Sequence, residues 1–363
     1  MAKLGDIATY VNGFAFKPSD WSNEGLPIIR IQDLTGNSYQ ANRYNGSYHP
    51  KYEVNDGDVL ISWSASLGVY VWKGEKAVLN QHIFKVVFDK SEVDKNFFVH
   101  QVQNILENAA SEAHGATMKH LTKPVFDALP FYLPSIEKQK EIASVLDKAT
   151  ELIALRKEQL AKLDELVKAR FVELFGNGHD GKTPVKMLGS ICKFQQGTQI
   201  PVEEQFEEQI AGYKRFLRII DYTQAPQPPR YVNVNGKEVD EKSVVIVRYG
   251  ATAGFVGRGY QGILANNLFE IIPDETILSK EFLFLALKYG TFEKEVHDKA
   301  FGAAMPALSF SMMNDIPVVV PMSEQQSQFV SFVEQTDKSK LAVQQSLDRL
   351  ELLKKALMQE YFG

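Results

Sequence analysis

The sequence of 363 residues predicts an α+β protein in which one unit occurs twice, each copy being a mixed α and β domain followed by a long helix. Short motifs recur in the same order at a nearly constant offset. Short apolar runs bounded by Gly, Asp and Asn are typical of strands, and two stretches of about 40 residues carry apolar side chains at alternating spacings of three and four. Together these observations predict two α/β domains joined by two long antiparallel coiled-coil helices, with a pseudo-two-fold internal repeat.

The repeat can be followed along the whole chain. Residues 4–7 (LGDI) recur as residues 188–191 (LGSI), Gly13 recurs as Gly197, and residues 30–34 (RIQDL) recur as residues 218–222 (RIIDY). Residues 59–68 (VLISWSASLG) align with residues 245–254 (VIVRYGATAG) at an offset of 186, and Asn80 and Gln81 align with Asn266 and Asn267 at the same offset. The last block consists of Gly115, Met118, Leu121, Pro130, Pro134, Glu137 and Gln139, which return at an offset of 187 as Gly302, Met305, Leu308, Pro317, Pro321, Glu324 and Gln326. A duplicated domain explains this order.

Four segments follow from the repeat. They are a first domain over residues 1–134, a central spacer helix over 135–176, a second domain over 177–321 and a C-terminal spacer helix over 322–363. Runs rich in Val, Ile and Phe predict strands at residues 27–31, 59–62, 83–88, 244–247 and 269–272, and helices are expected at residues 97–108 and 280–289. Each domain is therefore expected to mix strands, helices and Gly-rich loops.

The two spacer segments have the pattern of long helices that pair with each other. The predicted seam comprises Leu146, Ile153, Leu160, Leu163, Val167 and Leu174 on the first helix and Val333, Val343, Leu347, Leu350 and Leu357 on the second. The first helix runs from the first domain to the second domain, and the second helix starts at the second domain. If the two helices pack against each other, they must therefore be antiparallel. Each would be about 60 Å long. The alternative is that each amphipathic helix lies on its own domain.

Charge and composition restrict the classes of function. The formal net charge is −5, and in none of the four segments do Lys and Arg outnumber Asp and Glu, which argues against a protein that binds nucleic acid through bulk positive charge. The single cysteine, Cys192, excludes an internal disulfide and argues against a zinc site with several thiolates. Since the sequence has neither an apolar run of about 18 residues nor the apolar core of a signal peptide, we expect a cytoplasmic protein with no membrane partner.

The sequence contains no constellation that predicts catalysis or a metal site. Residues 176–183 (GNGHDGKT) satisfy the phosphate-loop pattern, but they follow a predicted helix and meet Pro184, whereas a phosphate loop follows a strand and opens a helix. The histidines have no metal-ligand spacing, and His114 and His120 are expected in loops. Two domains without catalytic residues indicate a recognition protein or a scaffold.

The order of domain, long helix, second domain and second long helix resembles the specificity subunit of type I restriction-modification enzymes. The residues that carry this resemblance are the signature at residues 133–139 (LPSIEKQ), its copy at 320–326 (VPMSEQQ), the opening LGDI with Gly13, and the strand at residues 57–62 (GDVLIS). The resemblance implies a non-catalytic subunit whose two target recognition domains each read one half of a bipartite sequence in double-stranded DNA. It also implies that the helices set the gap between the two halves.

The resemblance further implies partners and their cofactors. Two methyltransferase subunits would dock on the helices and methylate adenine with S-adenosylmethionine, and restriction subunits would add cleavage that depends on ATP and Mg. No cofactor is expected in this chain itself. The alternative that the residues leave open is a two-headed interaction scaffold on a coiled-coil spacer, with no role in DNA binding.

Residues that read bases cannot be transferred from the family, because the recognition loops differ between members. Hydrogen bonds in the DNA groove need Arg, Lys, Asn or Gln, with aromatic side chains as supports. The candidates for DNA binding are Arg43, Trp63, Ser64, Lys119 and His120 in the first domain and Arg215, Arg248, Tyr249 and Asn267 in the second. For Arg30 and Arg218, each three residues before an Asp, the alternative to DNA binding is a structural pair with Asp33 and Asp221.

Overall fold

The computed structural model describes residues 1–37, 42–64, 66–112, 122–176, 181–224, 227–300 and 307–363. It divides into two compact units, one formed by Met1–Lys157 with Gln345–Gly363 and the other by Glu158–Gln344. Each unit contains one domain and a part of both long helices, so the boundaries of the four segments remain predictions. In the described ranges no helix is both long and apolar enough to cross a membrane.

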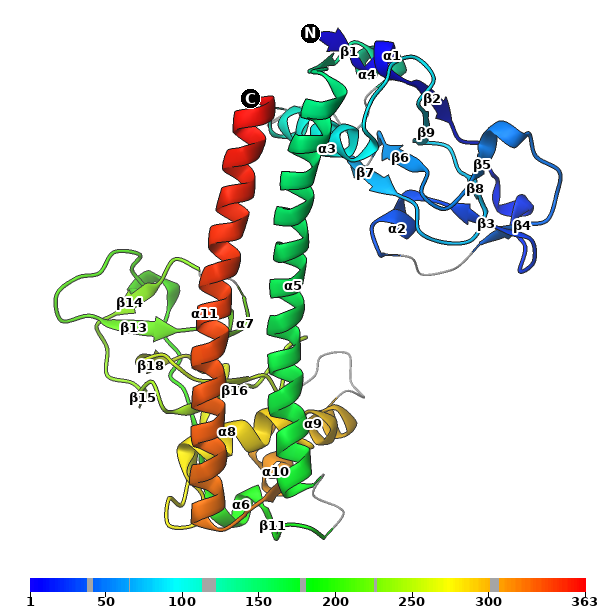
Figure 1. Ribbon diagram of the computed structural model, residues 1–363. Coiled ribbons are helices and arrows are strands. Elements are labelled where there is room, and N and C mark those ends of the chain that lie inside the picture. Colours follow the sequence, from blue (N-terminus) through cyan, green and yellow to red (C-terminus); the bar gives the residue numbers. More distant parts are fainter. Residues whose placement is uncertain (38–41, 65, 113–121, 177–180, 225–226, 301–306) are drawn as a thin grey trace. The chain divides into compact units, whose positions relative to one another are not determined.

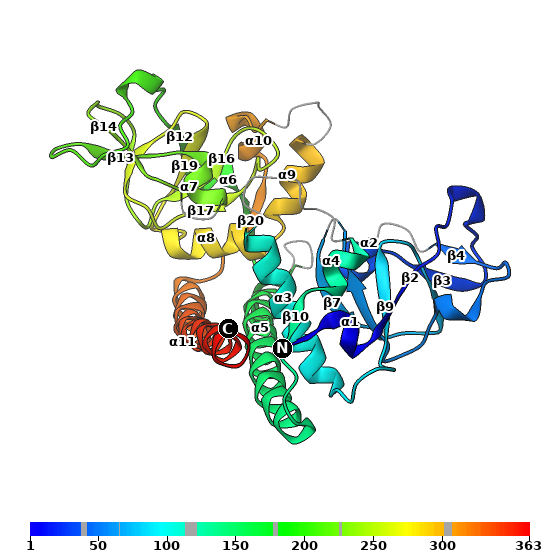
Figure 2. The ribbon, with the colours of Figure 1, turned by 90° about the horizontal axis from the view of Figure 1, so that it is seen from above.

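The first unit holds the first domain, which is blue and cyan in Figures 1 and 2. An antiparallel sheet has the strand order β2-β9-β6-β7, and a second sheet has the order β4-β3-β8-β5 with β3 and β8 parallel. The strands are β1 (Ala2–Lys3), β2 (Thr9–Asn12), β3 (Leu26–Ile29), β4 (Arg43–Tyr44), β5 (Glu53–Val54), β6 (Val59–Ser62), β7 (Gly68–Val71), β8 (Ala77–Leu79), β9 (Ile83–Val87) and β10 (Pro130–Phe131). The helices are α1 (Leu4–Ile7), η1 (Pro18–Asp20), α2 (Ile31–Leu34), η2 (Pro50–Tyr52), α3 (Lys95–Glu112) and α4 (Lys123–Asp127).

The second unit repeats this topology with its own strands. The sheets have the orders β12-β19-β16-β17 and β14-β13-β18-β15, with β13 and β18 parallel, and the small pair β11-β20 corresponds to β1-β10. The strands are β11 (Val185–Met187), β12 (Cys192–Gln196), β13 (Lys214–Leu217), β14 (Arg230–Val232), β15 (Glu238–Val239), β16 (Val244–Val247), β17 (Val256–Gly257), β18 (Gly262–Leu264), β19 (Leu268–Pro273) and β20 (Pro317–Val319). The helices are α6 (Leu188–Ile191), η3 (Val202–Glu204), α7 (Ile219–Thr223), α8 (Lys280–Tyr289), α9 (Phe292–Ala300) and α10 (Phe310–Asn314). The α+β class and the internal repeat are thereby confirmed.

The two spacer helices are α5 (Ile136–Phe175) and α11 (Ser323–Phe362), and they run antiparallel in each unit. In the first unit Lys157 Nζ lies 2.9 Å from Glu351 Oε1, and Leu146 and Met358 share one core. In the second unit Lys340 Nζ lies 2.5 Å from Asp164 Oδ1. In the second unit the Phe171 ring also lies 5.5 Å from the Phe329 ring. Within each unit, residues later in α5 therefore contact residues earlier in α11.

The seam residues follow the predicted stripe along most of both helices. Leu146 and Val167 on α5 are fully buried, and the other predicted positions are buried or half-buried with one exception. The exception is Leu174, which is 38% exposed, because the end of α5 turns Phe171 and Phe175 into the core of the second domain instead. The first turns of α5 likewise pack on the first domain through Ile142. The start of α5 therefore lies on its own domain, as the alternative proposed, whereas its end lies on the second domain. Ion pairs with α11 join the turns between these two ends within each unit.

The offset of 186 that was predicted for the middle part of the repeat is wrong by one residue. The amide of Trp63 donates to the carbonyl of His82 (3.3 Å), and the amide of Arg248 donates to the carbonyl of Asn267 (2.9 Å), which gives an offset of 185 rather than 186. The reason is a loop insertion: Ile61 pairs with Val69, but Ile246 pairs with Val256, two residues further along. Aligning the glycines after this loop displaced the strand by one position, which reverses its two faces.

Candidate nucleic-acid interface

The candidates Trp63, Arg248 and Asn267 lie at equivalent positions of the two antiparallel sheets, on the side of each sheet where strands begin or end. In the first domain this is the edge where β2 and β6 end and β9 begins, since Asn12 pairs with Phe84 and Ser62 pairs with Ile83. Trp63 and His82 directly flank these positions. We call Asn12, Trp63 and His82 edge cluster 1.

Edge cluster 1 is built around a stacked tryptophan. The Trp63 ring lies 5.6 Å from the Phe84 ring at an interplanar angle of 23° and 5.0 Å from the His82 ring. Its indole Nε1 donates to Asn12 Oδ1 over 3.3 Å. His82 has φ 73°, the one positive value of a residue other than glycine in the described ranges. Such a conformation is costly and is found preferentially at functional sites.

Edge cluster 2 consists of Gln196, Arg248 and Asn267 at the matching positions of the second domain. Arg248 Nε donates to the carbonyl of Leu308 over 3.2 Å, and the guanidinium lies 4.8 Å from the centre of the Tyr249 ring and 5.9 Å from that of Phe310. Among the residues that the structure describes, none accepts a hydrogen bond from the two terminal nitrogens of this guanidinium. Its stem is thus fixed, and none of the described residues occupies its fork of donors.

The two other members of edge cluster 2 add amide groups. Asn267 Oδ1 is buried and has no hydrogen-bond partner in the part of the chain that the structure describes. Gln196 Nε2 donates to the carbonyl of Asn266 over 2.9 Å. A fixed Arg fork suits guanine, and it is the group of edge cluster 2 that can reach a base, because the Asn267 amide oxygen is buried and the Gln196 amide nitrogen is engaged. Edge cluster 1 has the aromatic rings of Trp63 and His82 at the equivalent positions. One scaffold therefore presents different chemistry in the two domains.

Two predicted DNA-binding arginines are occupied by contacts inside the protein. Arg43 donates to the carbonyl of Gly25 over 2.6 Å and to Glu75 Oε1 over 2.5 Å. Arg215 pairs with the buried carboxylate of Asp221 at 3.2 Å and lies over the Tyr260 ring. These contacts favour a structural role for both arginines.

The remaining candidates in the first domain are Ser64, Lys119 and His120. Ser64 is only 5% exposed and its carbonyl accepts from Ser62 Oγ, so its predicted contact with a DNA groove does not fit its position inside the loop. Lys119 and His120 lie outside the described residues. In the second domain Tyr249 is exposed and its ring supports Arg248.

The structural pairs given as the alternative for Arg30 and Arg218 are confirmed. Asp33 Oδ2 accepts from the amide of Arg30 over 2.8 Å, and Asp221 Oδ2 accepts from the amide of Arg218 over the same distance. Each Asp thus caps the short helix that begins after the Arg. In the second domain Arg218 Nε adds a 3.0 Å contact to the same carboxylate.

Asn12, His82 and Gln196 were missed by sequence reasoning, although a signal was present. Each of Asn12 and Gln196 precedes a repeated glycine, and a Cβ on Gly13 would stand 2.0 Å from the carbonyl oxygen of Asn80. At Gly197 the corresponding distance to the oxygen of Ala265 is 2.1 Å. The repeated glycine therefore marks where the chain after β2, or after β12 in the second domain, passes close to the backbone just before β9 or β19. The register error concealed the equivalence of His82 and Asn267.

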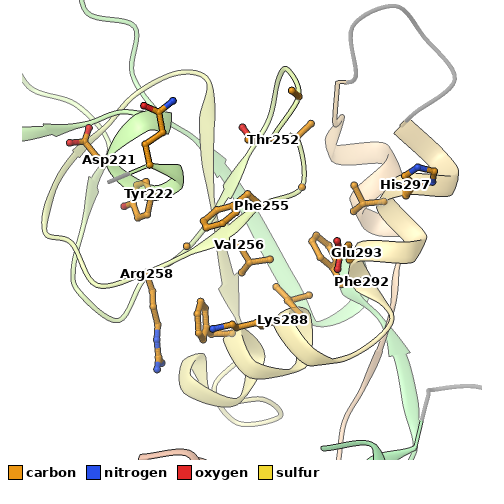
Figure 3. A pocket seen from close by; sticks show the side chains of 18 of the residues that line it. Asp221, Tyr222, Thr252, Phe255, Val256, Arg258, Lys288, Phe292, Glu293 and His297 are labelled. Carbon is orange, nitrogen blue, oxygen red and sulfur yellow. The ribbon is translucent and has the colours of Figure 1, made fainter. Parts of the chain in front are cut away.

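The second domain also contains a cavity of about 670 Å³ whose lining includes none of the three residues of edge cluster 2. Figure 3 shows Tyr222 and Arg258 on one side and Phe292 and Glu293 across from them. The Arg258 guanidinium lies 4.3 Å from the centre of the Phe284 ring. The cavity adjoins the break between α8 and α9, whereas in the first domain α3 continues along β7 and Gln103 Oε1 accepts from the amide of Val69. The two domains therefore differ beyond their edge clusters.

In the residues that the structure describes, the phosphate-loop pattern has a structural role. Lys182 Nζ donates to the carbonyl of Glu173 in the last turn of α5 over 3.1 Å, and β11 follows rather than a helix. A cation at the carbonyl end of a helix stabilises it. This arrangement agrees with a linker and not with a nucleotide site.

Comparison with known proteins gives one consistent family. A family model described as "Type I restriction modification DNA specificity domain" matches residues 1–165 and again residues 182–352. The EcoBI specificity subunit of Escherichia coli is 22% identical over 99% of this chain and 84% of its own length, and the MjaVIII specificity subunit of Methanocaldococcus jannaschii is 21% identical over 99% and 90%.

Solved structures show the same fold. A specificity subunit from M. genitalium superposes with a TM-score of 0.59 at 16% identity, covering 99% of this chain and 95% of that one. A chain from work on complex assembly in the type I restriction-modification system reaches 0.62 at 16% identity, covering 99% and 96%. With two tandem matches to the family model and matching topology in both units, the chain belongs to the type I restriction-modification specificity family, as the DNA sequence-specificity subunit.

Proposed function

We propose that each domain reads one half of a bipartite DNA sequence through its edge cluster, and that the chain itself catalyses no reaction. The observation that carries this proposal is the pair of edge clusters. Equivalent positions on one scaffold hold Trp63 and His82 in one domain and Arg248 and Asn267 in the other. Two half-sites of different sequence require such a difference.

The acidic balance of the chain supports the need for partners. Phosphate contacts supply most of the affinity for DNA, and a chain with a net charge of −5 is poor in them. We infer that two methyltransferase subunits hold the DNA with this subunit in the cytoplasm. S-adenosylmethionine belongs to those subunits, and ATP with Mg belongs to restriction subunits that join the complex.

Exposed leucines on the spacer helices support a docking surface for a methyltransferase subunit. In the first unit Leu155 on α5 is 51% exposed and Leu352 on α11 is 70% exposed, and Leu152 and Leu353 are exposed beside them. Leu152 and Leu155 are one turn apart on α5, and Leu352 and Leu353 are neighbours on α11. Exposed apolar side chains are typical of protein interfaces. The docking surface is defined here as these four leucines.

Methylation mapping tests the proposed function. The chain is co-expressed with a type I methyltransferase subunit in cells without background adenine methylation, and methylated adenines are mapped across the genome. We expect one bipartite motif with a fixed gap. An assembled, folded complex that adds no methylation would contradict the proposal and favour the scaffold alternative.

A further inference from the structure

The glutamine that ends each copy of the signature at residues 133–139 and 320–326 is buried in an equivalent place in both units. Gln139 is 1% exposed and Gln326 is 4% exposed, although both lie in the first turns of long helices with many exposed residues. Glutamine is mostly a surface residue, and a buried amide is tolerated only when its polar atoms are bonded. The contacts of these two amides are therefore informative.

In the first unit Gln139 connects α5 to the beginning of α3. Its Oε1 accepts a hydrogen bond from the amide of Asp94 over 2.9 Å, and its Nε2 donates to the carbonyl of Pro134 over 2.8 Å. Asp94 in turn caps α3, because its Oδ1 accepts from the amide of Phe97 over 2.9 Å. One side chain of the spacer helix thus binds the backbone at the N-terminus of the main domain helix, which lies beside α5 in Figures 1 and 2.

The second unit contains the same arrangement with a different capping residue. Gln326 Oε1 accepts from the amide of Ser279 over 3.0 Å, and Ser279 Oγ accepts from the amide of Phe282 at the start of α8. Gln326 Nε2 donates to the carbonyls of Pro321 and Ile277, both over 2.9 Å. Asp94 and Ser279 differ chemically, but the atom bound by glutamine is a backbone amide in both cases. The contact is therefore independent of the domain's own sequence.

We propose that Gln139 and Gln326 are positioning residues that fix the orientation of each recognition domain on its spacer helix and so the gap length that the enzyme accepts. This inference rests on the proposed function. Each glutamine bonds backbone at two places, the domain helix and the proline before the spacer helix, and it lies at the junction of the two. A domain of this size has a radius of gyration of roughly 14 Å. The part of its surface that would read DNA therefore lies roughly 20 Å from the junction with the spacer helix. A tilt of about 10° would move that surface by about 3.5 Å, close to the rise of one base pair.

The inference explains why a single glutamine accompanies domains that differ elsewhere. Edge clusters 1 and 2 carry different side chains, and α8 breaks where α3 continues. The glutamine contacts use only backbone atoms of the domain and therefore hold domains of different sequence in the same orientation. New specificities can arise without altering the geometry of the gap.

The test replaces each glutamine by Met in the complete complex with methyltransferase subunits. Methionine has nearly the same volume and removes both kinds of hydrogen bond. Methylation rates are measured on a set of duplexes whose gap is native, one base pair shorter or one base pair longer. Gln328→Met is the matched control, because Gln328 is exposed on the same helix as Gln326 and its side chain bonds only Glu324 of that helix among the described residues.

We expect Gln139→Met and Gln326→Met to lower the preference for the native gap about three- to tenfold, as one or two lost hydrogen bonds would. The bases read in each half-site should stay the same, and Gln328→Met should behave as wild type. Loss of stability alone would lower all rates equally and leave the gap preference unchanged. That outcome would overturn the inference.

Gln139→Glu keeps the test decisive if the Met variants do not assemble. The carboxylate still accepts from the Asp94 amide but places negative charge against the carbonyl of Pro134, and the same gap preference is measured. A wild-type complex that methylates no gapped motif would refute the proposed function. A wild-type complex with a sharp gap preference that every glutamine variant retains would refute this inference alone.

Discussion

Replacing Arg248 by Ala should weaken reading of the second half-site and leave the first half-site intact. The guanidinium is held at Nε by the carbonyl of Leu308 and supported by Tyr249, so its two terminal nitrogens are oriented before DNA arrives. A bidentate contact from such a fork to guanine contributes about 1–3 kcal/mol of discrimination, or about 5- to 150-fold in affinity. Arg248→Lys should lose most of this, because an ammonium group lacks the fork.

The assay is competition binding of the assembled complex to duplexes in which each base pair of the mapped motif is changed in turn. In Arg248→Ala at least one position of the second half-site should lose its preference. Arg258→Ala is the matched control, since this arginine also lies over an aromatic ring in the same domain but lines the cavity instead of edge cluster 2. An affinity loss in Arg248→Ala that is equal for every duplex would identify a phosphate contact and refute the assignment.

Two further predictions concern the helices. Phe171→Ala should destabilise the second unit by about 3–5 kcal/mol and lower Tm by roughly 10 °C in a thermal melt, because Phe171 is buried against Phe175 and Phe329. Val172→Ala, at an exposed neighbour, serves as its control, and equal melting of the two variants would contradict the packing described. Leu155→Glu should reduce co-purification of a methyltransferase subunit at least about tenfold, since it puts a charge into an apolar contact. Ala154→Glu, exposed on another face of α5, should not, and unaffected capture by Leu155→Glu would exclude the docking surface.

The repeat and the long helices could be predicted because they depend on periodicity. Leu146, Val333 and Leu347 occupy regular positions along continuous helices, and all three are buried. The seam departs from the pattern only at Leu174, where contacts with a domain core favour Phe171 and Phe175. Local periodicity contains no information about what a helix end meets in the folded chain.

The candidate site was predicted less completely, for two physical reasons. A loop two residues longer in the second domain displaced the alignment of β6 with β16, which hid the equivalence of His82 and Asn267. The occupation of Arg43 and Arg215 by Glu75 and Asp221 depends on tertiary contacts that a list of basic residues does not contain. By contrast, Arg30 and Arg218 could be assigned, because capping by an Asp three residues later is local.

The central claim is that the two domains read their half-sites independently, and a domain exchange tests it most directly. Residues 1–134 are replaced by the first domain of another specificity subunit whose target is known, and the methylated motif of the resulting complex is mapped. The account predicts that one half-site changes to that of the donor while the second half-site and the gap remain those of this chain. A motif in which both halves change, or an assembled complex that keeps the original motif, would contradict it.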